Sequence, residues 1–202
     1  MRLVKKKNVG IFIFDFVEVL DFSGPYEVFS SVRLSKKSTS SIQNLAQAFN
    51  VFTVSERKKL ITTTGGLRVK SDFILKDCPT LDILIVPGGI GTRKLLDNKN
   101  VLKWLLLKKD IDIVASVCTG SLLLAKAGLL KERKATTHWG ALKLLKKLSP
   151  STKVIKKSKF IFDNYYTSAG ISSGIDMSLH IIEKLLGKKI AKNTAKYIEY
   201  KY

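Results

Sequence analysis

The stretch Ile111-Asp-Ile-Val-Ala-Ser-Val-Cys-Thr-Gly120 leads from a strand pattern straight into a helix pattern, and it decides the fold class. Residues 111–117 are mostly apolar without strict alternation, which is typical of a strand buried on both faces. Two further apolar runs, Asn8–Phe14 and Leu81–Val86, are also followed by helical patterns. This alternation predicts an α/β fold in which helices cover both faces of a mainly parallel central sheet, a three-layer sandwich.

The rest of the chain extends the same pattern. Asp163-Asn164 separates two short β-rich runs and predicts a hairpin turn. No repeat or Pro/Gly-rich linker interrupts the sequence, so we expect a single domain over residues 1–202. The remaining predicted strands are 48–55, 67–75 (an edge strand or hairpin arm), 160–162 and 165–167, and the predicted helices are 22–34, 92–108, 120–127, 139–148, 171–186 and 190–200.

The composition is that of a globular protein with a strongly basic surface. The 202 residues include 36 Lys and Arg against 16 Asp and Glu, a formal net charge of +20. The basic residues are mostly lysines spread along the chain, which favours a solvated surface over a sequence-specific nucleic-acid reader. No apolar stretch approaches the ~20 residues of a membrane-spanning helix. We therefore expect a cytoplasmic protein that binds neither membranes nor specific nucleic acid.

Cys118 lies at the apex of a strand-to-helix turn. A nucleophile elbow needs small residues two positions to either side of the nucleophile, and Ser116 and Gly120 meet that need. A helix N-terminus stabilises thiolate, so we expect a lowered pKa for this thiol. The alternative is a small structural cysteine at a buried strand end. The other cysteine, Cys78, has no electropositive neighbour in sequence, and two cysteines cannot form a zinc cluster.

Pro87-Gly88-Gly89 follows the second apolar strand. Glycine lets a backbone N–H approach a ligand closely, so Gly88 and Gly89 could form an oxyanion hole with the N–H of Thr119. The alternative is an ordinary tight turn. Both loops should meet at the carboxyl ends of adjacent parallel strands, where ligands bind in such folds.

Three further side chains are candidates for the same crevice. Asp21 follows the first strand, and a partly desolvated carboxyl next to a thiol is suited to donate a proton near neutral pH. Its alternative role is a helix N-cap. His138 could pair with Cys118, although a structural histidine near the site is the commoner case. Glu27, one turn into a helix, is a lesser candidate that could simply bond a helix neighbour.

Taken together, these segments resemble the ThiJ/PfpI family of the class I glutamine amidotransferase-like superfamily. The resemblance runs from the first strand to Gly170-Ile-Ser-Ser-Gly-Ile-Asp176 and so covers nearly the whole chain. It implies a flavodoxin-like sheet. The segments that carry it are Leu20-Asp-Phe-Ser-Gly-Pro-Tyr-Glu-Val-Phe29, Pro87-Gly-Gly89, Ala115-Ser-Val-Cys-Thr-Gly-Ser121 and Ala135-Thr-Thr-His-Trp139.

Within that family, the residues most resemble the isocyanide (isonitrile) hydratases and the amidase-like domains of some transcription regulators. The resemblance implies that Cys118 is the nucleophile, that Gly89 and Thr119 are oxyanion donors, and that Asp21 is the nearby acid. Protease-like members carry His after the nucleophile, whereas this chain has Thr119, which matches the hydratases.

The expected activity is therefore cysteine-dependent hydration of an isocyanide, or amidase-type hydrolysis, on a small molecule. It needs no metal or organic cofactor, and the resemblance implies a homodimer. Two alternatives remain open. One is another cysteine chemistry, of the glyoxalase, deglycase or protease type, and the other is a non-enzymatic domain that senses a ligand or oxidation.

Overall fold

A seven-stranded sheet forms the centre of the protein. The computed structural model describes residues 6–34, 47–57 and 60–202, and it orders the strands β10-β11-β7-β6-β1-β2-β5. Neighbouring strands run parallel except for the hairpin of β10 and β11, which confirms the turn predicted at Asp163-Asn164. The strands are β1 Lys7–Phe12, β2 Phe49–Ser55, β5 Phe73–Ile74, β6 Ile83–Val86, β7 Ile113–Ser116, β10 Phe160–Asp163 and β11 Tyr165–Ser168.

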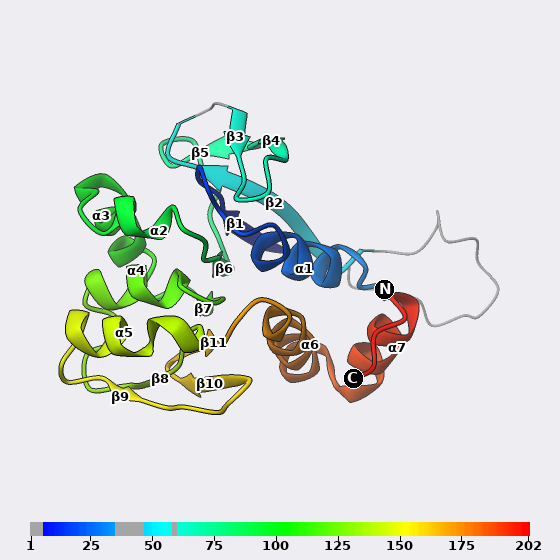
Figure 1. Cartoon of the computed structure of the whole chain (residues 1–202). Coiled ribbons are helices and arrows are strands. Elements are labelled where there is room, and N and C mark those ends of the chain that lie inside the picture. The colour runs from blue at the N-terminus through cyan, green and yellow to red at the C-terminus, as the bar shows by residue number, and fades with distance from the viewer. Residues whose placement is uncertain (1–5, 35–46, 58–59) are drawn as a thin grey trace.

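Helices cover both faces of this sheet, which confirms the predicted three-layer, mainly parallel architecture. Figure 1 shows the two groups on opposite sides of the strands. One group packs in the order α1, α6, α7, with contacts from α1 to α6 and from α6 to α7. This layer consists of α1 Val19–Ser30, α6 Ser173–Leu186 and α7 Lys188–Tyr197, and the opposite layer of α2 Thr92–Leu95, α3 Lys99–Leu107, α4 Gly120–Lys126 and α5 Leu142–Leu148.

The central strands are apolar throughout because both of their faces are buried. All four residues of β6 are buried, and β6 pairs with β1 on one side and with β7 on the other. Each large aliphatic side chain buried in this way contributes roughly 1.5–3 kcal/mol of transfer free energy. The sheet therefore holds the loops at its ends on a rigid base.

Two predicted elements are divided in the structure, and two predicted helices have other bounds: the helix predicted over 22–34 spans Val19–Ser30, and the one predicted over 139–148 begins with a 3₁₀ turn. The helix predicted over 92–108 is divided into α2 and α3, because the Asn98 side chain accepts the N–H groups of Asn100 and Val101 and caps a new helix. The segment predicted over 67–75 is also divided, between a hairpin and the edge of the main sheet. The remaining small elements are β3 Leu60–Thr62, β4 Arg68–Lys70, β8 Lys134–Ala135, β9 Lys153–Val154 and a 3₁₀ turn at Trp139–Ala141.

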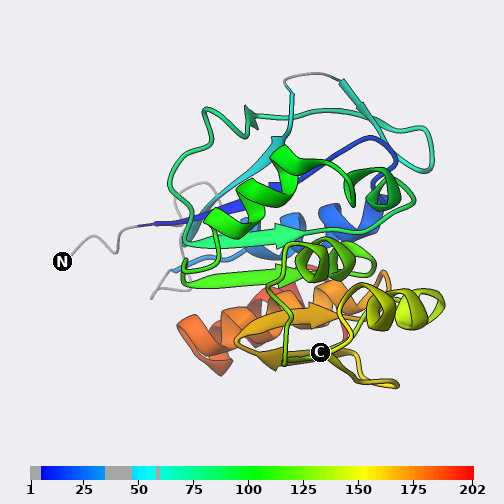
Figure 2. The same ribbon diagram turned by 90° about the vertical axis from the view of Figure 1, so that its left-hand side faces the viewer.

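The loops that follow the parallel strands lie on one side of the molecule. In Figure 2 the strands β1, β6 and β7 all point the same way. After β1 the chain adds β2 on one side and later β6 on the other, so β1 and β6 flank a topological switch point. The loops after these strands are bonded together: the N–H of Glu18 donates to Gly88 O at 2.9 Å, and that of Gly91 donates to Phe16 O at 3.1 Å.

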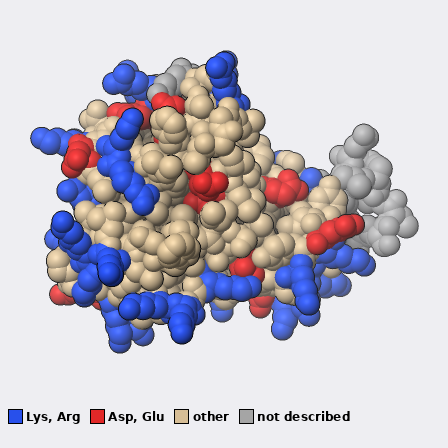
Figure 3. Space-filling model, viewed as in Figure 1, with Lys and Arg blue, Asp and Glu red and all other residues tan. Residues whose placement is uncertain are grey.

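Charged side chains on the face seen in Figure 1 gather at its rim. Figure 3 shows Lys and Arg around the edge of this face, while its centre consists of uncharged and a few acidic residues.

Within the described ranges, none of the helices combines the length and the hydrophobicity that crossing a bilayer requires.

A methyl group at Gly120 should disrupt the junction between β6 and α4. A Cβ built there would lie 1.9 Å from Val86 O and 2.8 Å from Pro87 O, both backbone atoms. We expect Gly120→Ala to lower the free energy of unfolding by at least about 2 kcal/mol, measured by urea denaturation. Gly65→Ala is the matched control, because a Cβ at Gly65 meets nothing within 4 Å. Equal stability of the two variants would contradict this account of the junction.

Candidate active site

Cys118 occupies a strained turn between β7 and α4. Its φ is +54°, a left-handed conformation that side-chain-bearing residues rarely adopt. Both flanking small residues are buried, and Gly120 lets α4 begin directly beside the end of β6. The thiol-bearing residue itself is only 6% exposed. This is the geometry of a nucleophile elbow, as the spacing of Ser116, Cys118 and Gly120 predicts.

Three hydrogen bonds fix the Cys118 backbone in this conformation. Its N–H donates to Ala169 O at 2.8 Å, beyond the end of β11. Its carbonyl oxygen accepts the hydroxyl of Thr137 at 2.9 Å and that of Ser121 at 3.2 Å. Thr137 was not singled out from the sequence, because its neighbour His138 carries the more reactive side chain. Its buried hydroxyl links the segment 135–139 to the elbow.

Asp21 lies in the first turn of α1 and is fully buried. The helix begins at Val19, so the alternative role of Asp21 as N-cap is wrong, and Glu18 holds that position. The Asp21 Oδ2 accepts the N–H of Gly88 at 2.9 Å. Its Oδ1 has no hydrogen-bond partner within the described part of the chain, yet the carboxyl group interacts with the thiol of Cys118. The fold therefore joins a buried carboxyl to the elbow thiol.

Burial sets the acidities of this pair. It raises the pKa of Asp21 to about 7, and the charge of Glu18 adds to the rise while the Gly88 N–H opposes it. Burial also raises the pKa of Cys118 to about 12, with a further rise from the charge of Asp21 and a partial offset from the backbone N–H of Thr119. The lowered thiol pKa expected from the helix N-terminus is therefore wrong, because desolvation and the neighbouring carboxylate outweigh that effect.

The glycine N–H groups after β6 are engaged inside the protein. The Gly88 N–H donates to Asp21, and the Gly89 N–H donates to the hydroxyl oxygen of Thr119 at 3.0 Å. The Thr119 N–H interacts with the Cys118 sulfur. The three donors expected to form an oxyanion hole thus already have acceptors, and the turn serves to hold the acid and the nucleophile. Gly89 is required here by its φ of +126°.

A group of buried hydroxyls supports this turn from α2. The Thr92 hydroxyl, at the start of α2, lies 2.8 Å from Gly89 O and 3.2 Å from the hydroxyl oxygen of Thr119. The Arg93 guanidinium also donates to Gly89 O at 3.2 Å. Nothing in the sequence pattern distinguishes Thr92 from a surface helix residue, since its burial depends on how α2 packs over the elbow.

The two remaining candidates lie outside this cluster of interactions. The Nδ1 of His138 accepts the N–H of Gly140 at 3.2 Å and so caps the 3₁₀ turn, as a structural histidine would. Its ring packs so closely on residue 170 that a Cβ there would lie 2.6 Å from Cδ2. Glu27 is exposed and accepts the hydroxyl of Ser31, one turn along the chain.

The arrangement is suited to move one proton between sulfur and carboxyl oxygen. A thiol with a raised pKa attacks an electrophile efficiently when a base removes its proton during attack, and Asp21 is placed to accept that proton. Among the residues that the structure describes, there is no group of three or more His, Cys, Asp or Glu side chains that could hold a metal ion.

Replacing Asp21 by Asn should stabilise the protein in a pH-dependent way. The carboxyl ionises near pH 4 in the unfolded chain and near pH 7 in the folded one, so stability falls as pH rises through this window. Asn carries no charge to desolvate. We expect Asp21→Asn to match wild type near pH 4 and to exceed it by a few kcal/mol at pH 8, within roughly the 4 kcal/mol that three pKa units represent.

Thermal denaturation between pH 4 and 8 measures this difference. The exposed Asp97 provides the control, because its side chain is 90% accessible. Asp97→Asn should change stability equally at both ends of the range. A constant offset for Asp21→Asn across the same range would show that its carboxyl is not desolvated.

The same variant should make Cys118 more reactive at alkaline pH. Loss of the Asp21 charge removes one of the two causes that raise the thiol pKa most. We expect alkylation of Cys118 by iodoacetamide, followed by mass spectrometry, to begin at lower pH in Asp21→Asn than in wild type. The half-buried Cys78 is the internal reference and should label identically in both proteins. Unchanged labelling of Cys118 would show that the charge of Asp21 does not affect the pKa of the Cys118 thiol.

Comparison with known proteins places this site in a family. The profile of the DJ-1/PfpI family matches residues 7–184. Isonitrile hydratase from Pseudomonas putida is 34% identical over 195 residues, which cover 96% of this chain and 78% of the hydratase. The transcriptional regulator GbdR from Pseudomonas aeruginosa is 28% identical over 139 residues, which cover 69% of this chain but only 38% of the regulator.

Solved structures agree with this assignment. A ThiJ/PfpI family protein from Pseudomonas syringae superimposes with a TM-score of 0.85 at 25% identity, over 98% of this chain and 77% of that one. Drosophila melanogaster DJ-1beta shares the fold with a TM-score of 0.80 at 18% identity, over 98% of this chain and all of that one. With the family profile matching most of its length, the chain belongs to the DJ-1/PfpI family, also called ThiJ/PfpI.

Proposed function

We propose that this protein is a cysteine-dependent hydratase that converts a small isocyanide into an N-substituted formamide. The similarity to isonitrile hydratase covers most of both chains and supports this class of substrate. The buried contact between Asp21 and Cys118 supplies the nucleophile and the proton carrier that the reaction needs. The reaction adds one water to the isocyanide and leaves no by-product.

In the first step the sulfur of Cys118 bonds to the terminal carbon of the isocyanide. Asp21 takes the thiol proton as the sulfur attacks, and the resulting carboxylic acid delivers that proton to the same carbon. The product is a thioimidate, in which the carbon carries hydrogen and sulfur and is doubly bonded to nitrogen. With its pKa near 7, Asp21 can accept and donate this proton at neutral pH.

In the second step a water molecule attacks the thioimidate carbon. Asp21 removes one proton from this water and passes it to the nitrogen as the carbon–nitrogen double bond opens. The carbon–sulfur bond then breaks, the second proton of the added water passes from its oxygen through Asp21 to the sulfur, and the formamide leaves. The pair returns to its starting state with one proton shared between the two side chains.

The observation that carries this proposal is the internal use of the Gly88 and Gly89 N–H groups. Hydrolysis of an amide or peptide builds negative charge on the carbonyl oxygen and depends on unengaged donors that stabilise it. Addition to an isocyanide builds its charge on carbon, where a proton neutralises it. Here the Gly88 and Gly89 N–H groups are bonded to Asp21 and Thr119. This favours hydratase activity over the amidase and protease alternatives.

A ligand-sensing domain is the second candidate. The similarity to GbdR covers 69% of this chain, and an AraC family transcriptional regulator from Pseudomonas putida has a TM-score of 0.79 at 17% identity. In such a role the site around Cys118 would bind a small molecule without turnover. We further propose a cytoplasmic homodimer, in which the dimer follows from the family resemblance, and the dispersed lysines lead us to expect no sequence-specific DNA binding. Size-exclusion chromatography tests the dimer, and anisotropy titrations with two unrelated duplexes at several salt concentrations test the DNA binding.

Turnover of a simple alkyl isocyanide tests the proposal. We expect wild type to form the formamide, Cys118→Ala to lose activity, and Asp21→Asn to lose about 10²–10⁴-fold in kcat. Cys78→Ala should retain full activity, because the Cys78 thiol donates to the carbonyl oxygen of its neighbour Pro79 and takes no part in the contacts described for the elbow. Formamide production is followed by mass spectrometry, with the buffer blank subtracted.

Two results would contradict the proposal. Saturable binding of isocyanides without any formamide would favour the sensing role. Equal activity of Asp21→Asn and wild type would leave the carboxyl with a structural role only, because the amide keeps the acceptor for Gly88 but cannot carry the proton.

A further inference from the structure

A cavity that Cys118 does not line lies beside the loop after β1. Its volume is about 230 Å³, and it opens at the carboxyl ends of β1 and β2, between the β3 strand and α2. A dry apolar cavity of about 150 Å³ is known to bind benzene. The space is therefore sufficient for one aromatic ring with a short substituent.

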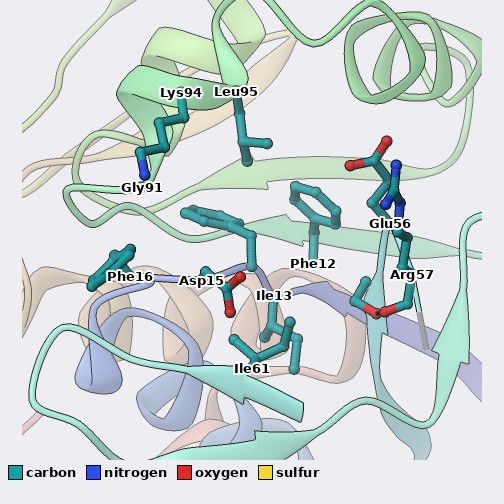
Figure 4. Close-up of a pocket in the computed structure, with 12 residues that line it drawn as sticks. Phe12, Ile13, Asp15, Phe16, Glu56, Arg57, Ile61, Gly91, Lys94 and Leu95 are labelled. Carbon is teal, nitrogen blue, oxygen red and sulfur yellow. Dashed lines mark hydrogen bonds between the residues drawn. The ribbon is translucent and has the colours of Figure 1, made fainter. Parts of the chain in front are cut away.

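The floor of this cavity is apolar and rigid. Its base consists of Phe12, Ile13 and Ile61, which are almost completely buried, so the apolar surface that a ligand can reach comes from Phe16 and Leu95. Figure 4 shows the Phe12 ring directed toward Leu95 of α2 across the space. Because these side chains are held by the sheet, the cavity does not need to be formed by the ligand.

Two cations and two carboxylates line its sides. Figure 4 shows Lys94 on one side of the cavity and Arg57 on the other. The carboxylates already accept N–H groups: Glu56 accepts that of the Asn98 side chain at 2.9 Å, and Asp15 accepts that of Thr62 at 3.2 Å.

The cations lack such acceptors. The Lys94 ammonium lies 5.6 Å from the centre of the Phe16 ring, and within the described ranges neither it nor the Arg57 guanidinium donates to an oxygen from its side chain. Both cations are exposed, so the lining offers charged donors that an anion can reach beside an apolar surface.

We propose that this cavity binds a small carboxylate that carries an aromatic or branched aliphatic group. The apolar group packs against the accessible side chains of Leu95 and Phe16, and the carboxylate accepts hydrogen bonds from Arg57. None of the residues around the cavity belongs to the group of Asp21, Gly88, Cys118 and Thr119.

The two sites nevertheless share one wall. Gly91 lines the cavity and its N–H donates to Phe16 O, while a Cβ at Gly89 would lie 2.3 Å from the same oxygen. A ligand held against Phe16 would thus contact the segment that supports the Gly88-Gly89 turn.

Binding of 3-phenylpropionate tests this proposal, with isothermal titration calorimetry as the measurement. We expect the acid to bind at one site, 3-phenylpropan-1-ol to bind about tenfold more weakly, and 3-phenylpropylamine more weakly still, since a hydrogen bond to a charged group contributes this much. Arg57→Gln should weaken binding of the acid about tenfold. Arg68→Gln is the matched control, an exposed arginine on β4 outside the cavity, and it should bind like wild type.

Two more variants locate the bound acid. Leu95→Trp should fill the cavity and abolish binding while the protein keeps a cooperative thermal transition. Cys118→Ser should bind 3-phenylpropionate as wild type does, so this result stands whether or not isocyanides are substrates. The proposal is overturned if the acid does not bind, if the amine or alcohol binds equally well, if Arg57→Gln and Arg68→Gln behave alike, or if Cys118→Ser loses binding.

Discussion

The buried contact that joins Asp21 to Gly88 and Cys118 is the interaction on which the rest of the site depends. It brings together the first turn of α1, the loop after β6 and the elbow after β7. A carboxyl group without access to water is costly to ionise, and one backbone N–H compensates only part of that cost. The chain keeps this group at the junction of three loops, and its environment brings its pKa close to neutral pH.

Close backbone packing makes this contact possible. A side chain at Gly91 would lie 2.0 Å from Asp15 O, and one at Gly120 would lie 1.9 Å from Val86 O. The loops after β1, β6 and β7 therefore lie directly against one another, with no room for side chains between them. Such packing leaves the N–H groups of Gly88 and Gly89 pointing at acceptors inside the protein and fixes Asp21 beside the sulfur.

The chemistry follows from how the pair shares its proton. A cysteine protease keeps its nucleophile as thiolate beside a positive partner, which lowers the thiol pKa. Here the partner is a carboxyl group and the thiol pKa is raised, so attack and proton transfer have to occur together. An isocyanide carbon, which accepts both a nucleophile and a proton, fits such a pair better than a carbonyl group does.

The sequence by itself determined the fold class, the family and the elbow, because these depend on local patterns. Short apolar runs such as 81–86, bounded by turn residues and alternating with helical patterns, are typical of strands buried on both faces, and Ser116, Cys118 and Gly120 have the spacing of a nucleophile elbow. The sequence also indicated Asp21, although it left open whether that residue caps a helix.

Only the tertiary structure decided the direction of the Cys118 pKa and the partners of the glycine N–H groups. Desolvation depends on everything packed around a group, and the residues that contact Cys118 come from segments as far apart as 21, 137 and 169. The start of α1 at Val19 and the break at Asn98 likewise followed from contacts and caps that outweigh helical periodicity. The cavity beside Arg57 has the same origin, because strand pairing and the packing of α2 bring Phe12, Arg57 and Leu95 together, and no local pattern encodes their proximity.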